Sequence, residues 1–209
     1  MLVDTSVPNI AFGATSMDVL RYIASLNPHI LSFEFSRYKP VINVSEMKVE
    51  PDLKTLMTRH YPPKDTTKLN AFQVINNPDP NFGLDLADGE VINLHSRVIT
   101  QSGAILHVPM MDLDSDTFTI SDENLQRVVK YAKIIGREGV VLQTGRSYHY
   151  YGFHLMTTEE YWSEFIPQSM RGKVCDIRFI SHKLEDQFIT LRITAGGIRN
   201  TEPKVVAII

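Results

Sequence analysis

The sequence predicts an α+β fold with a mainly antiparallel sheet, and three observations support this prediction. Short strand-like runs follow one another from residue 90 to residue 194, and two helical patterns interrupt them. Their order is strand, strand, helix, strand, strand, helix, strand, strand, which favours helices packed on an antiparallel sheet. With 209 residues, of which 43% are hydrophobic, the chain is long enough to bury a core without disulfides.

The N-terminal part is predicted to contain one helix and one strand. A helix is expected over residues 15–26, because Thr15 and Asp18 form a capping pattern and apolar residues then recur at helical spacing. Pro28 disfavours helix in the residue before it, so the helix should end there. Residues 30–35 are predicted to form a strand.

A loop-rich segment follows and suggests how the chain is organised. Residues 60–82 are rich in proline, asparagine and aspartate, so mostly loop is expected there. We expect a single domain that spans residues 1–209, with this segment as the seam between halves 1–82 and 83–209.

The C-terminal part contains the most regular pattern. The expected elements are strands over residues 90–100 and 104–113, a helix from Ser121, a strand over 139–144, a tight connection over 145–152, a strand over 153–156, a helix capped by Thr157 and Glu160, and strands over 176–180 and 188–194. The helix from Ser121 has an apolar face, which consists of Leu125, Val128, Val129, Ala132 and Ile135.

Composition limits the classes of protein to which the chain can belong. The net charge is −3, whereas proteins that coat nucleic acid usually have a strong basic excess, so we expect nucleic-acid contact to be weak or local. The single cysteine, Cys175, lies in an apolar run and is interpreted as a small buried residue. Without a signal-peptide pattern or an apolar run of ~20 residues, no membrane association is expected, and we expect a cytoplasmic location.

The first candidate motif is an apolar strand that runs directly into two carboxylates. Asp112 and Asp114 occupy alternate positions, so both side chains should lie on one face of the strand. Mg²⁺ is typically bound by one or two carboxylates together with waters and substrate phosphates, and a metal pair can orient the oxygens in phosphoryl chemistry. A solvated acidic turn is the alternative interpretation.

The second candidate motif is a glycine-flanked turn over residues 144–152, which displays Arg146, Ser147, His149 and three tyrosines. Backbone amides of such a turn can bind phosphate oxygens, and the arginine and histidine can add donors. An aromatic hairpin held by cross-strand pairs is the alternative.

The third candidate motif is Asp176 within an apolar run. A buried carboxylate is costly unless it is paired or bound to a metal. Arg178 lies two residues further on, so a structural salt bridge is an equally open interpretation, and Arg192 is ambiguous in the same way.

Taken in this order, the three motifs resemble the archaeo-eukaryotic primase–polymerase superfamily. The matching residues are Asp112-Leu113-Asp114, then Ser147-Tyr148-His149, then Cys175-Asp176, and the segment from 176 to 194 looks like the small, stand-alone bacterial branch called primase-like. The resemblance implies a primase–polymerase-like core with an N-terminal α/β half and an RRM-like C-terminal half.

The resemblance also implies a function, which is metal-dependent nucleotidyl transfer from a nucleoside triphosphate to the 3′ end of DNA or RNA. Asp112, Asp114 and Asp176 would then bind Mg²⁺ or Mn²⁺. Ser147 and His149 would contact the triphosphate, with Arg192 adding to that contact.

Two other functions stay open at this stage. The chain can be a catalytically weak nucleotide-binding module or a subunit of a larger complex. It can also be a metal-dependent phosphoesterase built on the aspartate pair and His149, since His107 and His154 lie close by in sequence. The sequence does not identify a protein partner.

Overall fold

The computed structural model describes residues 10–40, 64–79, 81–113, 121–135, 138–145, 147–171, 175 and 177–209. The helices are α1 (Ser16–Leu26), α3 (Ala71–Asn76), α4 (Asp122–Ile135), α5 (Thr158–Glu160), α6 (Ile166–Arg171) and α7 (Ile177–Asp186), and a π-helical turn, η2 (Tyr161–Phe165), joins α5 to α6. The strands are β1 (Ile30–Tyr38), β2 (Lys64–Asn70), β3 (Val91–Thr100), β4 (Ile105–His107), β5 (Met110–Leu113), β6 (Gly139–Gln143), β7 (Tyr148–Gly152), β8 (Met156–Thr157), β9 (Thr190–Arg192) and β10 (Lys204–Ile208).

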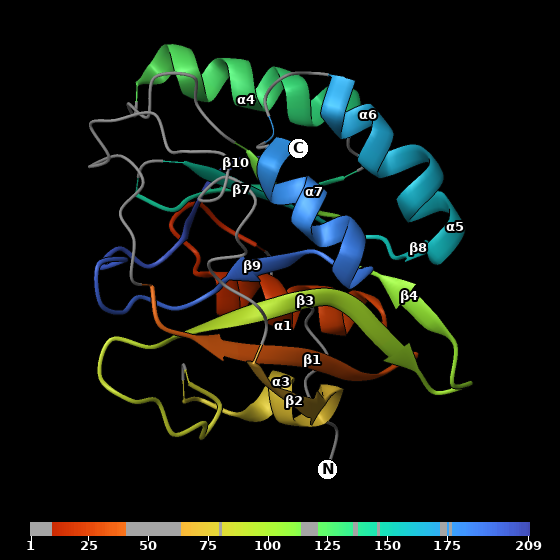
Figure 1. The fold of residues 1–209 in the computed structure, drawn as a ribbon, viewed down its shortest axis with the longest axis vertical. Coiled ribbons are helices and arrows are strands. Elements are labelled where there is room, and N and C mark those ends of the chain that lie inside the picture. The colour runs from red at the N-terminus through yellow and green to blue at the C-terminus, as the bar shows by residue number, and fades with distance from the viewer. Residues whose placement is uncertain are drawn as a thin grey trace.

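Two antiparallel sheets form the frame of the fold. One has the order β10-β6-β7-β5, and the other has the order β2-β1-β3-β4-β8 with β9 paired to β3. All strand pairs among the described residues are antiparallel, so the predicted α+β class with a mainly antiparallel sheet is confirmed. In Figure 1, α4 and α6 lie outside the first sheet, on the side away from β1 and β3.

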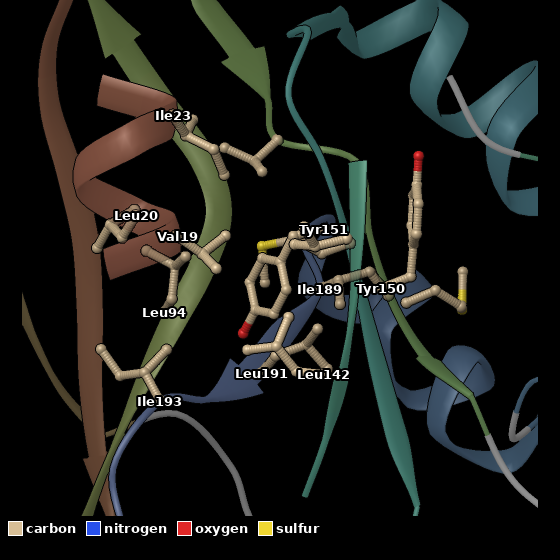
Figure 2. Packing of buried hydrophobic residues seen from close by; sticks show 14 of the residues in the cluster. Val19, Leu20, Ile23, Leu94, Leu142, Tyr150, Tyr151, Ile189, Leu191 and Ile193 are labelled. Atoms are coloured by element: carbon tan, nitrogen blue, oxygen red, sulfur yellow. The ribbon is translucent and has the colours of Figure 1, made fainter. Parts of the chain in front are cut away.

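The core lies on both sides of the β10-β6-β7-β5 sheet. Tyr150 and Tyr151 are neighbours on β7 whose side chains point to opposite sides of that sheet (Figure 2). Tyr151 points toward α1 and β3, where Val19 and Leu94 are fully buried. The ring of Tyr150 instead packs toward Phe165 of η2, with the ring centroids 6.3 Å apart. Each face of this sheet is therefore covered by a different layer.

Several predicted helices and strands are confirmed, and two of the helices begin at the capping residues that the sequence indicated. The capping box at Thr15 and Asp18 begins α1, and a second one at Thr157 and Glu160 begins α5. The strands β1, β3, β6 and β9 and the helix α4 all lie where the sequence pattern placed them. Cys175 is buried, as expected, and its Sγ donates to the backbone carbonyl of Ser169.

The loop predicted over residues 60–82 is wrong for most of its described part. The structure has β2 and α3 there, and the capping box of Asn70 and Gln73 begins α3. The strand β2 contains few residues that favour strands, and it forms by pairing with β1 at the edge of the sheet. β1 also pairs with β3, so this sheet joins segments from both sides of residue 82. The predicted single domain stays a prediction.

The other errors concern short segments whose pattern is ambiguous. The expected strand over residues 104–113 is two strands in different sheets, because Pro109 lies between β4 and β5. The expected tight connection over 145–152 contains the strand β7, and the strand expected over 153–156 is reduced to β8. The strand expected over 176–180 is the start of α7, since a short apolar run fits either element. The strand β10 was not expected.

His107 makes the fold sensitive to acid. Its side chain is 1% exposed, its Nδ1 lies 3.1 Å from the Ser96 hydroxyl, and its ring stacks on Tyr161 with centroids 4.5 Å apart. Burial lowers the pKa of His107 to about 4, and the charge of Arg97 contributes in the same direction. The neutral ring is therefore a requirement of this packing.

We expect the free energy of unfolding to fall by about 2 kcal/mol between pH 7 and pH 5 because of His107. The unfolded chain takes up the proton near pH ~6.5, whereas the folded chain stays neutral down to about pH 4, so acid favours unfolding. Urea titrations at both pH values measure the loss. His107→Gln should show a smaller pH dependence than the parent, and the exposed His154→Gln should match the parent. An unchanged pH dependence in His107→Gln would contradict this assignment.

Candidate active site

The structure brings Asp112 and His149 together on β5 and β7, the last two strands of the first sheet. They are direct partners in the register of β5 and β7, and Leu142 of β6 pairs with His149 on the other side. Asp112 Oδ1 lies 3.9 Å from His149 Nε2. The side chain of Asp112 is 28% exposed, whereas that of His149 is 7% exposed. The carboxylate is therefore the accessible member of the pair.

Alternation along β7 decides which way this pair faces. His149 and Tyr151 are two residues apart and share a face, and their ring centroids are 6.2 Å apart. Because Tyr151 points toward α1 and β3 in Figure 2, His149 and Asp112 face the space between the two sheets. They therefore lie on the face of the sheet opposite to α4 and α6.

His149 is neutral at pH 7 in this arrangement. Burial lowers the pKa of His149 well below its usual value, and the positive charges of Arg192 and Arg199 lower it further. The contact with Asp112 is thus between a carboxylate and a neutral imidazole. The Nδ1 atom of His149 is buried and has no hydrogen-bond partner among the residues that the structure describes.

Ser147 is held by a compact turn between β6 and β7. The Thr144 hydroxyl lies 2.9 Å from the Ser147 hydroxyl and donates to the Ser147 carbonyl at 3.1 Å. The backbone N–H of Thr144 also donates to the Ser147 carbonyl, at 2.9 Å. Gly145, between them, has a φ of 109°, a conformation that favours glycine. Thr144, which was not singled out in the sequence, therefore fixes where the Ser147 hydroxyl lies.

Arg192 joins this turn to the second sheet. Its guanidinium donates to the carbonyls of Thr144 at 2.9 Å, Thr194 at 2.6 Å and Thr201 at 2.7 Å. The residue is 6% exposed, and its bonds to the Thr144 and Thr194 carbonyls are buried, whereas the bond to the Thr201 carbonyl is partly buried. Arg192 thus connects the end of β9 with the β6–β7 turn and with the segment before β10. Its predicted contact with a triphosphate stays a prediction.

The remaining predicted site residues, which are Asp114, Arg146 and Asp176, lie outside the described residues. One described contact bears on two of them. Leu113 and Cys175 form an isolated antiparallel bridge, although 62 positions separate them in the sequence. Leu113 lies between Asp112 and Asp114 in sequence, and Cys175 directly precedes Asp176.

The donor chemistry of this region fits a hard divalent cation. Asp112 supplies a partly exposed carboxylate that faces the interior between the sheets, and carboxylate oxygen is the protein ligand that Mg²⁺ and Mn²⁺ prefer. Within the described ranges, which omit Asp114 and Asp176, no group of three or more His, Cys, Asp or Glu side chains is placed to hold a metal. The three-carboxylate site stays a prediction.

Comparison with known proteins places the chain among primase-like proteins. The family model that matches is AEP-like, described as archaeo-eukaryotic primase 1D-like, and it covers residues 81–205. This match includes more than half of the 209 residues, and the chain therefore belongs to this family. No curated protein and no solved structure matches.

Family membership confirms the resemblance to the primase–polymerase superfamily and establishes the general class of the protein. The chain belongs among primase- or polymerase-like nucleotidyltransferases, a class that binds nucleotides and nucleic acid and generally uses divalent metals. All seven predicted site residues lie within the matched range, whereas α1, β1, β2 and α3 lie outside it. Of the helices that the structure describes, none has the length and apolar character needed to cross a membrane.

Proposed function

We propose that this protein is a metal-dependent nucleotidyltransferase that binds a nucleoside triphosphate and transfers the nucleotide to the 3′ end of a nucleic-acid strand. The observation that best supports this proposal is the direct pairing of Asp112 with His149 on adjacent strands. In a protein of this primase-like family, the pairing would let the carboxylate bind metal beside an imidazole that binds phosphate.

The bridge between Leu113 and Cys175 supports the third carboxylate. Adjacent Cα atoms are ~3.8 Å apart, so the residues that flank a bridged pair cannot be far from each other. Asp112 and Asp114 flank Leu113, and Asp176 follows Cys175. We infer that these three carboxylates bind Mg²⁺ or Mn²⁺, which would neutralise phosphate charge and orient the attacking and leaving oxygens.

The residues of the β6–β7 turn would bind the triphosphate. Ser147 can donate a hydroxyl hydrogen bond to a phosphate oxygen, and His149 can donate one from its ring. Arg146 would add positive charge to the same group. Arg192 would hold the turn in place through its bond to the Thr144 carbonyl, in addition to any contact with phosphate. Positioning and charge neutralisation of this kind account for most of the catalysis of phosphoryl transfer.

A primer-extension assay tests the proposal directly. The full chain is incubated with a primed template, Mn²⁺ or Mg²⁺, and either ribonucleotides or deoxyribonucleotides. We expect metal-dependent extension of the primer with at least one nucleotide set. Hydrolysis of the triphosphate without extension would instead support a phosphoesterase, and binding without turnover would support a nucleotide-binding module.

Thr144 should act as a positioning residue for Ser147. Thr144→Val removes the hydroxyl that lies 2.9 Å from the Ser147 hydroxyl and that also donates to the Ser147 carbonyl. It leaves the bond from the Arg192 guanidinium to the Thr144 carbonyl in place. Loss of one such hydrogen bond corresponds to ~1 kcal/mol, so triphosphate affinity should fall about fivefold. Thr144→Ser keeps the hydroxyl and should retain the parent affinity. The ratio of triphosphate to nucleoside affinity is the measurement, and equal ratios in all three proteins would contradict this role.

A further inference from the structure

The helices α4 and α6 border a hollow of about 680 Å³, which we call the α4–α6 groove. Arg127, Lys130, Tyr131 and Ile134 of α4 line it, and their spacing of i, i+3, i+4 and i+7 puts them on one face of that helix. From α6, Arg171 contributes to the opposite wall. Arg127, Lys130, Ile134 and Arg171 are all exposed, so the groove is open to solvent.

The charge of the groove is opposite to that of the chain. Three cationic side chains, from Arg127, Lys130 and Arg171, line it, and its described lining includes no carboxylate. The chain as a whole has a net charge of −3. A positive concave surface on an acidic protein attracts and orients an anionic partner.

The floor of the groove distinguishes between two kinds of anionic partner. Ile134 is 72% exposed, and Tyr131 and Ile135 beside it are 6% and 7% exposed. Sites for single-stranded nucleic acid combine cations with exposed aromatic rings on which bases stack. The ring of Tyr131 is buried and its hydroxyl donates to the Ser169 carbonyl, so the groove offers an aliphatic contact instead of a stacking surface.

We propose that the α4–α6 groove binds an acidic segment of a partner protein. Carboxylates of the segment would pair with Arg127, Lys130 and Arg171, and one apolar side chain would pack on Ile134. The helices α4 and α6, whose residues line the groove, lie on the outer side of the β10-β6-β7-β5 sheet (Figure 1). Asp112 and His149 share the opposite face with Tyr151, because side chains alternate along β7 and Asp112 pairs with His149. Docking would therefore leave the candidate active site accessible, and the proposal does not depend on the proposed function.

Selection from a phage-displayed library of random short peptides tests this site without assuming a partner. The parent protein should enrich peptides that combine several acidic residues with a bulky apolar residue. A synthetic peptide of the enriched sequence should then bind Arg127→Glu/Lys130→Glu at least about tenfold more weakly, because two attractive charges become repulsive. Ile134→Ser should also weaken binding. Lys133→Glu, on an exposed position of α4 outside the groove, is the matched control and should bind like the parent.

Three results would overturn the proposal. The first is that the parent enriches no common sequence. The second is that the enriched peptide binds the Arg127→Glu/Lys130→Glu variant as tightly as it binds the parent. The third is that oligothymidylate displaces the peptide and loses affinity in the same variant, which would assign the groove to nucleic acid. Primer extension by the Arg127→Glu/Lys130→Glu variant tests the proposed function separately from peptide binding, since the substituted residues lie outside the candidate active site.

Discussion

Replacing Asp112 by asparagine is expected to lower the rate of nucleotide transfer by ~10²–10³-fold, because removal of one preorganised electrostatic group at a reaction centre has an effect of this size. Asparagine keeps the shape of the side chain but removes the charge that would bind the cation. Single-turnover primer extension with Mn²⁺ measures the loss. The double variant Asp112→Asn/Asp114→Asn should reduce the rate to background.

The fold should survive this substitution. Asp112 is partly exposed, and removal of one charge from the proposed group of carboxylates would relieve repulsion, so the melting temperature in metal-free buffer should hold or rise. Asp88→Asn, in an exposed turn, is the matched control and should keep both the activity and the stability of the parent. A large fall in the melting temperature of Asp112→Asn would show that the carboxylate is structural.

The second large effect is expected from His149. His149→Ala should weaken triphosphate binding about tenfold to a hundredfold, since a charge-assisted hydrogen bond to phosphate corresponds to ~1.5–3 kcal/mol. A nucleoside without phosphates should bind the variant almost as it binds the parent. Calorimetric titration of both ligands into both proteins, with Mg²⁺ present, measures the two affinities.

The buried position of His149 provides the competing explanation. The ring packs near Tyr151 and is almost fully covered, so its removal can also loosen the sheet. If His149 only packs, the variant should lose stability and lose affinity for both ligands equally. His154→Ala removes an exposed histidine and serves as the control for nonspecific effects. Equal losses of affinity for the triphosphate and the nucleoside would contradict a contact between His149 and phosphate.

The sequence predicted the elements whose local signals agree with their tertiary setting. Thr15 and Thr157 each begin a helix through side-chain bonds to nearby backbone, which short-range pattern reveals. The helix α4 and the strand β3 are each long enough for their pattern of apolar residues to identify the type of element. The same reasoning placed Asp112 on a strand but expected His149 in a tight connection, whereas the structure pairs the two residues directly on β5 and β7.

Other features depended on contacts that sequence spacing does not contain. β2 forms by pairing with β1 at the edge of its sheet. The break at Pro109 also depends on tertiary structure, because β4 joins one sheet and β5 joins the other. The role of Thr144 follows from its hydroxyl contact with Ser147, and a Thr/Ser pair three residues apart around a glycine was the available signal. The bond from Arg192 to the Thr144 carbonyl joins residues 48 positions apart in the chain.

The most direct test of the account is a crystal structure of the protein with Mn²⁺ and a non-hydrolysable nucleoside triphosphate. Anomalous scattering would locate each Mn²⁺ ion independently of the model of the protein. We expect at least one ion with carboxylate oxygens of Asp112, Asp114 and Asp176 at ~2.0–2.6 Å, and the triphosphate between that ion and the Ser147–His149 turn. An Asp176 side chain on the far face of the sheet, or Mn²⁺ bound away from Asp112, would contradict the proposed active site.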